Sequence, residues 1–343
     1  MVFVTQSLSD SGPAFDPAAW LADLREAYDA PALAVIAKAL DLAAQEAGFT
    51  QALGVANVLV GNDIRKAVIE IHFPASVYIF NTPTLIALGG ADFSASINGE
   101  MIPSHHPVLV NKSSILQFHK IVKGARAYLA IHEGIDVPEW LGSSSTHLRA
   151  GLGGYHGRAF QKDDEIMFKA SSHVSSILKD REFMVLPWQA GNEWGDITTE
   201  TFILPGYEWN RLTSSSKENF TMTSFVITNQ SDRMGYRLNN IPLSSITNEE
   251  VISSAVSFGT VQLLPDGRLI ILMADHQTTV GYPRVAHIIS AHHKKLAQMK
   301  AGDKIHFHLT DQLTAEDLLI KQQQHLQHLQ NACTFRLHEF LNK

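Results

Sequence analysis

Two short polar segments hold most of the residues in this chain that could do chemistry. The first spans 274–283 and combines an acid, an amide, two hydroxyls, a glycine and a phenol, namely Asp275, Gln277, Thr278, Thr279, Gly281 and Tyr282. The second spans 231–238 and contributes Arg233, Tyr236 and Arg237. Such groups orient small polar substrates and stabilise an oxyanion or a phosphate. The local alternative is a hydrogen-bonded turn whose side chains only satisfy the backbone.

The elements around these segments are predicted to be mostly strands. Apolar, β-branched runs indicate strands over 68–73, 77–80, 84–88, 95–98, 108–110, 115–118, 125–131, 259–264 and 268–273. Asn98-Gly99 and Pro265-Asp266-Gly267 are typical of tight turns. Helices are expected in three places only: 17–48, 284–299 and the tail from Thr314, which resembles a capped helix start. The helix over 284–299 would point its N-terminal amides at an anion bound by the first segment.

The polar segments also belong to a longer series of motifs. Arg-Met-Gly-Tyr-Arg-Leu at 233–238 and Asp-x-Gln-Thr-Thr-x-Gly-Tyr-Pro at 275–283 are accompanied, in order, by motifs at 56–62, 134–138, 141–143, 153–158, 205–209 and 259–262. Over about 56–307 the chain resembles the biotin-dependent carboxyltransferase family, also called the allophanate hydrolase subunit 2 family. The resemblance implies a mainly β protein with two cyclophilin-like β-barrel domains and a few peripheral helices. With the sequence, it predicts a helical segment over 1–50, barrels over 51–175 and 176–310, and a C-terminal helix over 311–343.

The same resemblance suggests the function. Members of this family include a subunit of an ATP-dependent 5-oxoprolinase, which opens the lactam of 5-oxo-L-proline to L-glutamate with subunits A and B. Catalytic roles are then expected for Arg233, Tyr236, Asp275, Gln277, Thr278 and Thr279. Substrate or nucleotide binding is expected for Ser143, Gly153, Gly154, Arg158, Arg237, Gly281 and Tyr282. The alternatives are the carboxyltransferase component of a biotin-dependent urea or amide carboxylase, and a non-catalytic regulator that binds its sister subunit.

The chain departs from the family pattern in three places. The family's opening Gln-Asp-x-Gly-Arg strand is missing, and 17–48 instead predicts two helices with a break near Asp29-Ala30, just before Pro31. Gly142-Ser143-Ser144-Ser145-Thr146 lacks the arginine of the family's Gly-Ser-Arg-Ser-Thr. Val280 replaces a glycine, and its Cβ makes a positive φ costly. The N-terminal layer is expected to contribute little to the site.

Composition excludes several other classes of function. The 343 residues carry a formal charge of −7, which argues against nucleic-acid binding. No apolar run is long enough for a membrane span, and the lone cysteine fits a reducing, cytoplasmic setting. The 17 histidines include His306-x-His308 on one strand face, but no third ligand follows nearby, so no metal is predicted. The sequence holds no P-loop and no evident nucleophile–base pair, so turnover is expected to require the partner subunits.

Overall fold

The computed structural model describes residues 2–4, 49–140, 142–148, 150–169, 172–191, 199–247 and 251–341. Internal contacts divide the chain into two compact units. Unit 1 comprises Met1–Leu42, Thr50–Gly195 and His325–Lys343, and unit 2 comprises Ala43–Phe49 and Asp196–Gln324. The helices predicted over 17–48 lie outside the described residues. The domain bounds expected from the sequence stay a prediction.

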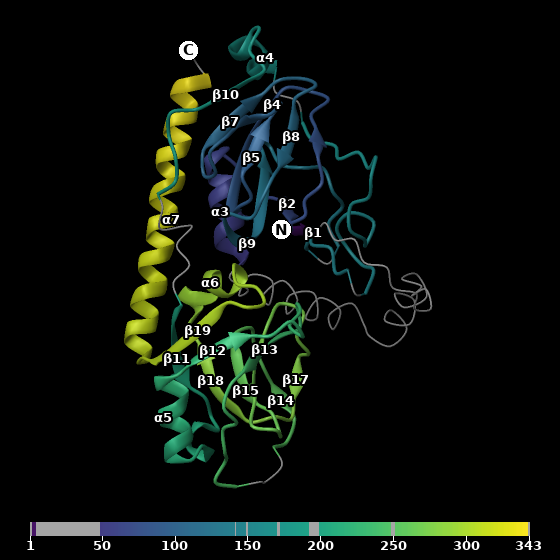
Figure 1. Ribbon diagram of the computed structural model, residues 1–343. Coiled ribbons are helices and arrows are strands. Elements are labelled where there is room, and N and C mark those ends of the chain that lie inside the picture. The colour runs from purple at the N-terminus through teal and green to yellow at the C-terminus, as the bar shows by residue number, and fades with distance from the viewer. Residues whose placement is uncertain are drawn as a thin grey trace. The chain divides into compact units, whose positions relative to one another are not determined.

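Unit 1 is built from two sheets. The larger has the order β1-β2-β9-β4-β7-β10, with β1 (Val2–Val4), β2 (Val68–Ile71), β9 (Lys123–Ile131), β4 (Thr84–Asp92), β7 (Pro107–Val110) and β10 (Phe183–Val185) (Figure 1). The smaller has the order β3-β8-β5-β6, with β3 (Tyr78–Ile79), β8 (Ile115–Phe118), β5 (Ala95–Ile97) and β6 (Glu100–Met101). Both sheets contribute buried side chains to one apolar core, for example Ile69 and Ile86 from the larger and Ile97 and Leu116 from the smaller. The strands predicted in this part of the sequence are confirmed.

The Ala-Asn-Val-Leu-Val-Gly-Asn motif at 56–62 serves the packing of a helix. Helix α3 (Phe49–Leu59) ends before Gly61, whose φ is +76°. Asn57 and Asn62 are buried, and Asn62 Nδ2 donates to Asn57 Oδ1 at 3.0 Å and to the carbonyl of Ile131 at 2.8 Å. Because these amides tie the helix end to β9, the motif has a structural role.

Unit 2 is centred on a closed barrel with the strand order β11-β18-β15-β16-β13-β12-β19. The strands are β11 (Glu200–Pro205), β18 (Arg284–Ile288), β15 (Thr260–Leu263), β16 (Leu269–Leu272), β13 (Gly235–Asn239), β12 (Ser224–Ile227) and β19 (Lys304–Leu309). All neighbouring pairs are antiparallel except β11 with β19, which are parallel and close the barrel. A two-stranded ribbon, β14 (Ser254–Ala255) with β17 (Thr279–Val280), lies outside the barrel sheet. The mainly β fold expected from the sequence is therefore confirmed.

Aromatic side chains fill part of unit 2. Helix α5 (Ser214–Met222) begins at its N-cap Thr213, whose side chain accepts from the Ser216 N–H at 3.2 Å. The helix buries Phe220 against Phe307, with ring centroids 5.0 Å apart, and against Phe225 at 5.7 Å. Aromatic rings in tilted contact of this kind add to the stabilisation that burial alone supplies.

The helix predicted over 284–299 is wrong in its first half. Residues Arg284–Ile288 form strand β18, and only Ser290–His292 (η3, a 3-10 turn) and His293–Ala297 (α6) are helical. Strand β18 pairs with β11 on one side and with β15 on the other. This tertiary pairing outweighs the apolar spacing that favoured a helix. No helix begins at Pro283, so the expected row of N-terminal amides facing the polar loop does not exist.

Several other elements differ from the sequence expectation. Helices α3, α4 (Ser172–Leu178) and α5 were not among the three predicted helical regions. A short strand, β1, pairs in parallel with β2 although the family's opening motif is absent. The C-terminal helix is confirmed as α7 (Gln312–Leu341), but it starts before Thr314. Asp311 is its cap, accepting from the Thr314 N–H at 2.9 Å.

Within the described residues, no helix is both long and apolar enough to cross a bilayer.

Candidate functional site

The two polar segments meet at one end of the barrel in unit 2. Arg233 Nε donates to Asp275 Oδ2 at 3.0 Å, and the backbone N–H of Asp275 donates to the carbonyl of Arg233 at 2.8 Å. The side chains are 28% and 18% exposed, so the pair is partly shielded from water. Strands β13 and β16 are paired, with Gly235 opposite Leu272. This pairing brings the loop that precedes β13 next to the loop that follows β16. Residues 42 positions apart thus form one ion pair.

A pocket of about 450 Å³ lies beside this pair. Its lining residues are Asp232, Met234, Arg237, Gln262, Leu264, Pro265, Asp266, Ile270, Leu272, His276, Gln277, Val280 and Tyr282. Of the expected site residues, Arg237, Gln277 and Tyr282 line it. Arg237 is exposed, and no side-chain hydrogen bond or ion pair of its guanidinium occurs within the described part of the chain. A guanidinium in this state is available to a carboxylate or a phosphate.

The pocket lining also includes Gln262. In the sequence this residue was noted only as part of the 259–262 motif. It lies on β15, the residue is 1% exposed, and its Nε2 has no hydrogen-bond partner among the described residues. An unsatisfied buried amide costs free energy, about 1–3 kcal/mol. A ligand oxygen in the pocket would satisfy it. The signal was present in the sequence as a glutamine within a buried strand, but its burial and missing partner were visible only in three dimensions.

Other expected site residues point elsewhere. Tyr236 is buried, and its hydroxyl donates to the carbonyl of Met299 at 2.9 Å, so this phenol is not part of the pocket lining. Strand alternation explains this, because neighbours Tyr236 and Arg237 face opposite sides of β13. Thr278 and Thr279 are exposed and lie outside the lining, where the carbonyl of Thr278 accepts from the Val256 N–H at 3.2 Å.

The Pro-Gly-Tyr-Glu-Trp motif at 205–209 anchors the far end of the polar loop. Glu208 is buried and accepts from the Arg284 backbone N–H at 2.8 Å, from its Nε at 3.2 Å and from its Nη2 at 3.1 Å. Burial alone would raise the pKa of Glu208, but the hydrogen bonds from Arg284 outweigh it and hold that pKa below its usual value. A Cβ at Gly206 would lie 2.1 Å from the Arg284 carbonyl, so the motif needs glycine for this close approach.

The remaining expected site residues belong to unit 1, in the glycine-rich loop. Arg158 Nη1 and Nη2 donate to Asp164 at 2.7 and 2.8 Å, and Nη1 also donates to the carbonyl of Ala159. The hydrogen bonds from Arg158 lower the pKa of Asp164 to about 2. At Gly153 and Gly154, both with positive φ, an added Cβ would lie 2.5 and 2.1 Å from atoms of the 145–146 segment. Ser143 Oγ accepts from the backbone N–H of Ser145 at 3.2 Å. These residues hold the loop together, and their binding roles stay predictions.

Known proteins are similar to this chain in sequence and in fold. The family model of the carboxyltransferase domain, subdomain A and B, matches residues 49–309. The chain belongs to this carboxyltransferase domain family. The C subunit of 5-oxoprolinase from Escherichia coli is 34% identical over 256 residues, which are 75% of this chain and 79% of that protein. Its counterpart from Haemophilus influenzae is 30% identical over the same shares. The crystal structure of Kluyveromyces lactis urea carboxylase superimposes with a TM-score of 0.72 at 25% identity, covering 81% of this chain and 26% of that one.

One departure of this carboxyltransferase domain from its family pattern has a structural explanation. Val280, which stands where the family has glycine, lies on strand β17 opposite Ser254 and does not have a positive φ. The next residue, Gly281, keeps the backbone close to the 251–253 segment, since a Cβ there would lie 3.2 Å from the Val251 carbonyl. Valine is therefore accommodated by the ribbon without strain.

Proposed function

We propose that the chain is a subunit of an ATP-dependent 5-oxoprolinase that cleaves 5-oxo-L-proline to L-glutamate. The observation that carries the proposal is the pocket on the barrel, where Arg237 offers an uncommitted guanidinium and Gln262 a buried, unsatisfied amide donor. 5-Oxoproline carries one carboxylate and one lactam carbonyl, which match these two groups. The naming of two relatives as a 5-oxoprolinase component supports the choice of substrate.

The pocket residues take distinct roles in this proposal. Arg237 binds the substrate carboxylate, and Gln262 Nε2 donates to the lactam oxygen, on which negative charge develops when the carbonyl is attacked. Gln277 is a second donor, and Tyr282 is a wall of the pocket. Arg233 and Asp275 act through position, because their ion pair fixes the two loops that carry Arg237 and Gln277. Gly281, Thr278 and Thr279 shape the loop and its ribbon.

A lactam is a poor electrophile, and ATP supplies the activation in the complete enzyme. Hydrolysis adds water across the ring C–N bond, which breaks to give the free amine and the second carboxylate of glutamate. We assign ATP use and part of this chemistry to partner subunits, A and B, in a cytoplasmic complex. Two observations support this assignment: the relatives are named as one lettered subunit of a larger enzyme, and the sequence contains no P-loop.

The second candidate function is carboxyl transfer to urea or another small amide. The fold likeness to urea carboxylase favours it, because that protein's name describes this reaction. Biotin would then be the carboxyl donor, and Gln262 would face its ureido oxygen. The third alternative, a non-catalytic regulator that binds its sister subunit, needs no ligand in the pocket.

Reconstitution separates the three functions. The full chain is purified alone and together with candidate subunits A and B, and glutamate formation from 5-oxo-L-proline is measured with and without ATP. We expect glutamate only from the complete complex with ATP. ATP-dependent hydrolysis by the single chain would contradict the assignment of ATP use to subunits A and B. Carboxylation of urea from carboxybiotin without glutamate formation would establish the second function. If the chain binds subunits A and B, but these two subunits form glutamate equally well without it, the chain would be a non-catalytic regulator.

A further inference from the structure

A second polar cluster of unit 2 lies outside the pocket lining, where β11 and β19 close the barrel. Glu200 is on β11, and His306 and His308 are on β19. In the parallel register Glu200 lies directly opposite His306, and Phe202 lies opposite His308. Because side chains two residues apart on a strand share a face, all three polar groups project from the same side of the strand pair.

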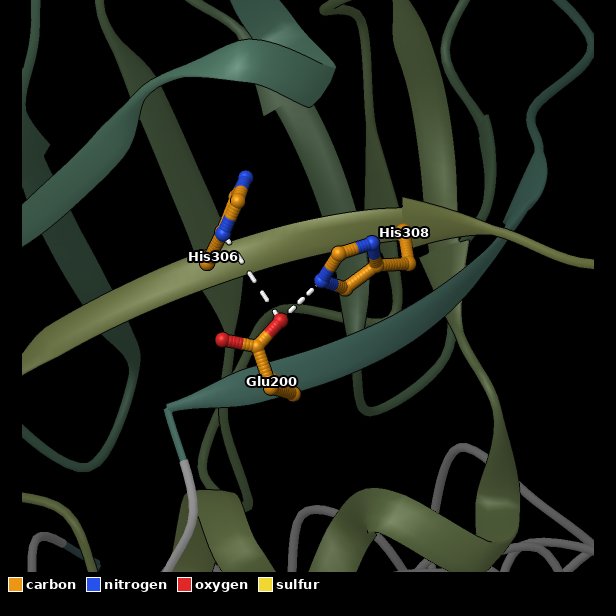
Figure 2. Close-up of side chains that lie close together, drawn as sticks. All are labelled: Glu200, His306 and His308. Atoms are coloured by element: carbon orange, nitrogen blue, oxygen red, sulfur yellow. Dashed lines mark hydrogen bonds and ion pairs between the residues drawn. The ribbon is translucent and has the colours of Figure 1, made fainter.

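The side chains converge, as Figure 2 shows. One ligand atom from each residue lies within 4.8 Å of the other two. His306 Nδ1 is 3.6 Å from Glu200 Oε2, and His308 Nε2 contacts the same carboxylate oxygen. We infer that Glu200, His306 and His308 form a binding site for one divalent transition-metal ion of the zinc type.

The hydrogen bond on the far side of His306 favours metal binding. Its Nε2 lies 2.9 Å from the carbonyl of Thr221, and a carbonyl only accepts, so Nε2 carries the proton. The lone pair of the neutral ring is then on Nδ1, which faces Glu200. A backbone carbonyl that holds the second ring nitrogen in this way is the usual support of a metal-bound histidine.

The other two ligands are supported as well. Thr199 Oγ1 donates to Glu200 Oε1 at 3.2 Å, which leaves Oε2 directed at the histidines. The Phe202 ring packs edge-on against His308, with centroids 6.1 Å apart. Side chains that are oriented before the ion arrives lose less conformational freedom on binding it.

The donor set determines the class of ion. Two imidazole nitrogens with one carboxylate oxygen suit Zn²⁺ and related first-row ions, whereas Mg²⁺ and Ca²⁺ prefer oxygen ligands alone. The side chains of Glu200, His306 and His308 are 49%, 27% and 39% exposed, so water can complete the coordination. An ion here would bridge the parallel pair β11–β19 and stabilise the closed barrel. The competing interpretation is a solvent-exposed histidine–carboxylate ion pair, which is worth little.

Calorimetry on the full, tag-free chain tests this inference. After chelation and dialysis the protein is titrated with ZnCl₂, and we expect one site with a Kd of about 1 µM or tighter, in keeping with three pre-oriented protein ligands. Glu200→Gln, His306→Gln and His308→Gln should each weaken binding by about 10-fold or more. His328→Gln, at an exposed histidine on α7, is the matched control and should leave the affinity unchanged.

A second readout guards against misfolded variants and adventitious binding. The melting temperature of each variant is first measured without metal, and then with Zn²⁺. The wild type and His328→Gln should gain stability with Zn²⁺, whereas the three ligand variants should not. Co²⁺ should give visible absorption bands in the wild type that His306→Gln removes. Zinc binding that survives all three ligand substitutions, or no binding at neutral pH, would overturn the proposed site.

Discussion

Two arginine–aspartate ion pairs of this protein are similar in type but differ in the groups that surround them. Arg158 and Asp164, in unit 1, are six residues apart and joined by two short hydrogen bonds, with a third from Arg158 to its own loop. Arg233 and Asp275, in unit 2, link two loops of the barrel, and the neighbouring pocket holds Arg237 and the unsatisfied Gln262. The first pair completes a self-contained loop. The second supports groups that still lack partners, which is the arrangement a ligand requires.

The largest effect should come from removing the uncommitted guanidinium. Arg237→Ala should lower kcat/KM of the reconstituted complex for 5-oxo-L-proline about 100-fold, because a charged contact to substrate is lost. Stability should change little, since Arg237 is exposed. Steady-state kinetics and thermal melting check both statements. Arg336→Ala, on the exposed face of α7, is the control, and equal kinetics for wild type and Arg237→Ala would remove Arg237 from the site.

The Arg233–Asp275 pair should act by positioning. Asp275→Asn and Arg233→Gln should each reduce activity about 10-fold and should each lower stability. The double variant should be less destabilised than the sum, with a coupling free energy of about 1 kcal/mol. Denaturant unfolding of the two single variants and the double variant measures this coupling. Strict additivity would mean that the pair does not form in solution.

Gln262 should show opposite effects on stability and activity. Gln262→Leu removes a buried donor without a partner and should stabilise the fold by about 1 kcal/mol, while weakening substrate binding several-fold. Thermal melting tests the expected gain in stability, and substrate titration tests the expected loss of affinity. Gln117→Leu, at a half-buried glutamine on β8, controls for the general effect of added apolar surface. Destabilisation by Gln262→Leu would indicate that its amide is satisfied in solution.

The smallest effect should come from the self-contained loop. Because Arg158 holds the folded-state pKa of Asp164 at about 2, below its unfolded value, the stabilisation is present at neutral pH and is lost as the pH falls from about 4 through 2. Asp164→Asn should therefore lower the melting temperature slightly at pH 7, and its difference from wild type should shrink toward pH 2. Activity should not change. The neighbouring Asp163→Asn is the control, and a large activity loss in Asp164→Asn alone would move this loop into the site.

The sequence predicted most of what depends on local pattern. The β-branched runs became strands, and Asn98-Gly99 forms its tight turn with both φ values positive, 50° and 87°. The ordered motifs by themselves indicated the carboxyltransferase domain family. Arg233 and Asp275 were expected in one site and do form an ion pair, because the strands that carry their loops are neighbours in the barrel.

Strand pairing decided the rest. The apolar spacing of Val285, Ile288 and Leu296 fits a helix as a pattern, but partners on β11 and β15 draw the first part of this segment into the barrel. Tyr236 and Arg237 are adjacent in sequence, yet only the register of β13 shows which of them reaches the pocket. Glu200 meets His306 across a parallel pair that joins residues more than 100 positions apart, a distance over which a local motif carries no information. Residue types and local propensities are properties of the sequence, whereas which side chains share a face follows from long-range pairing and exists only in the folded chain.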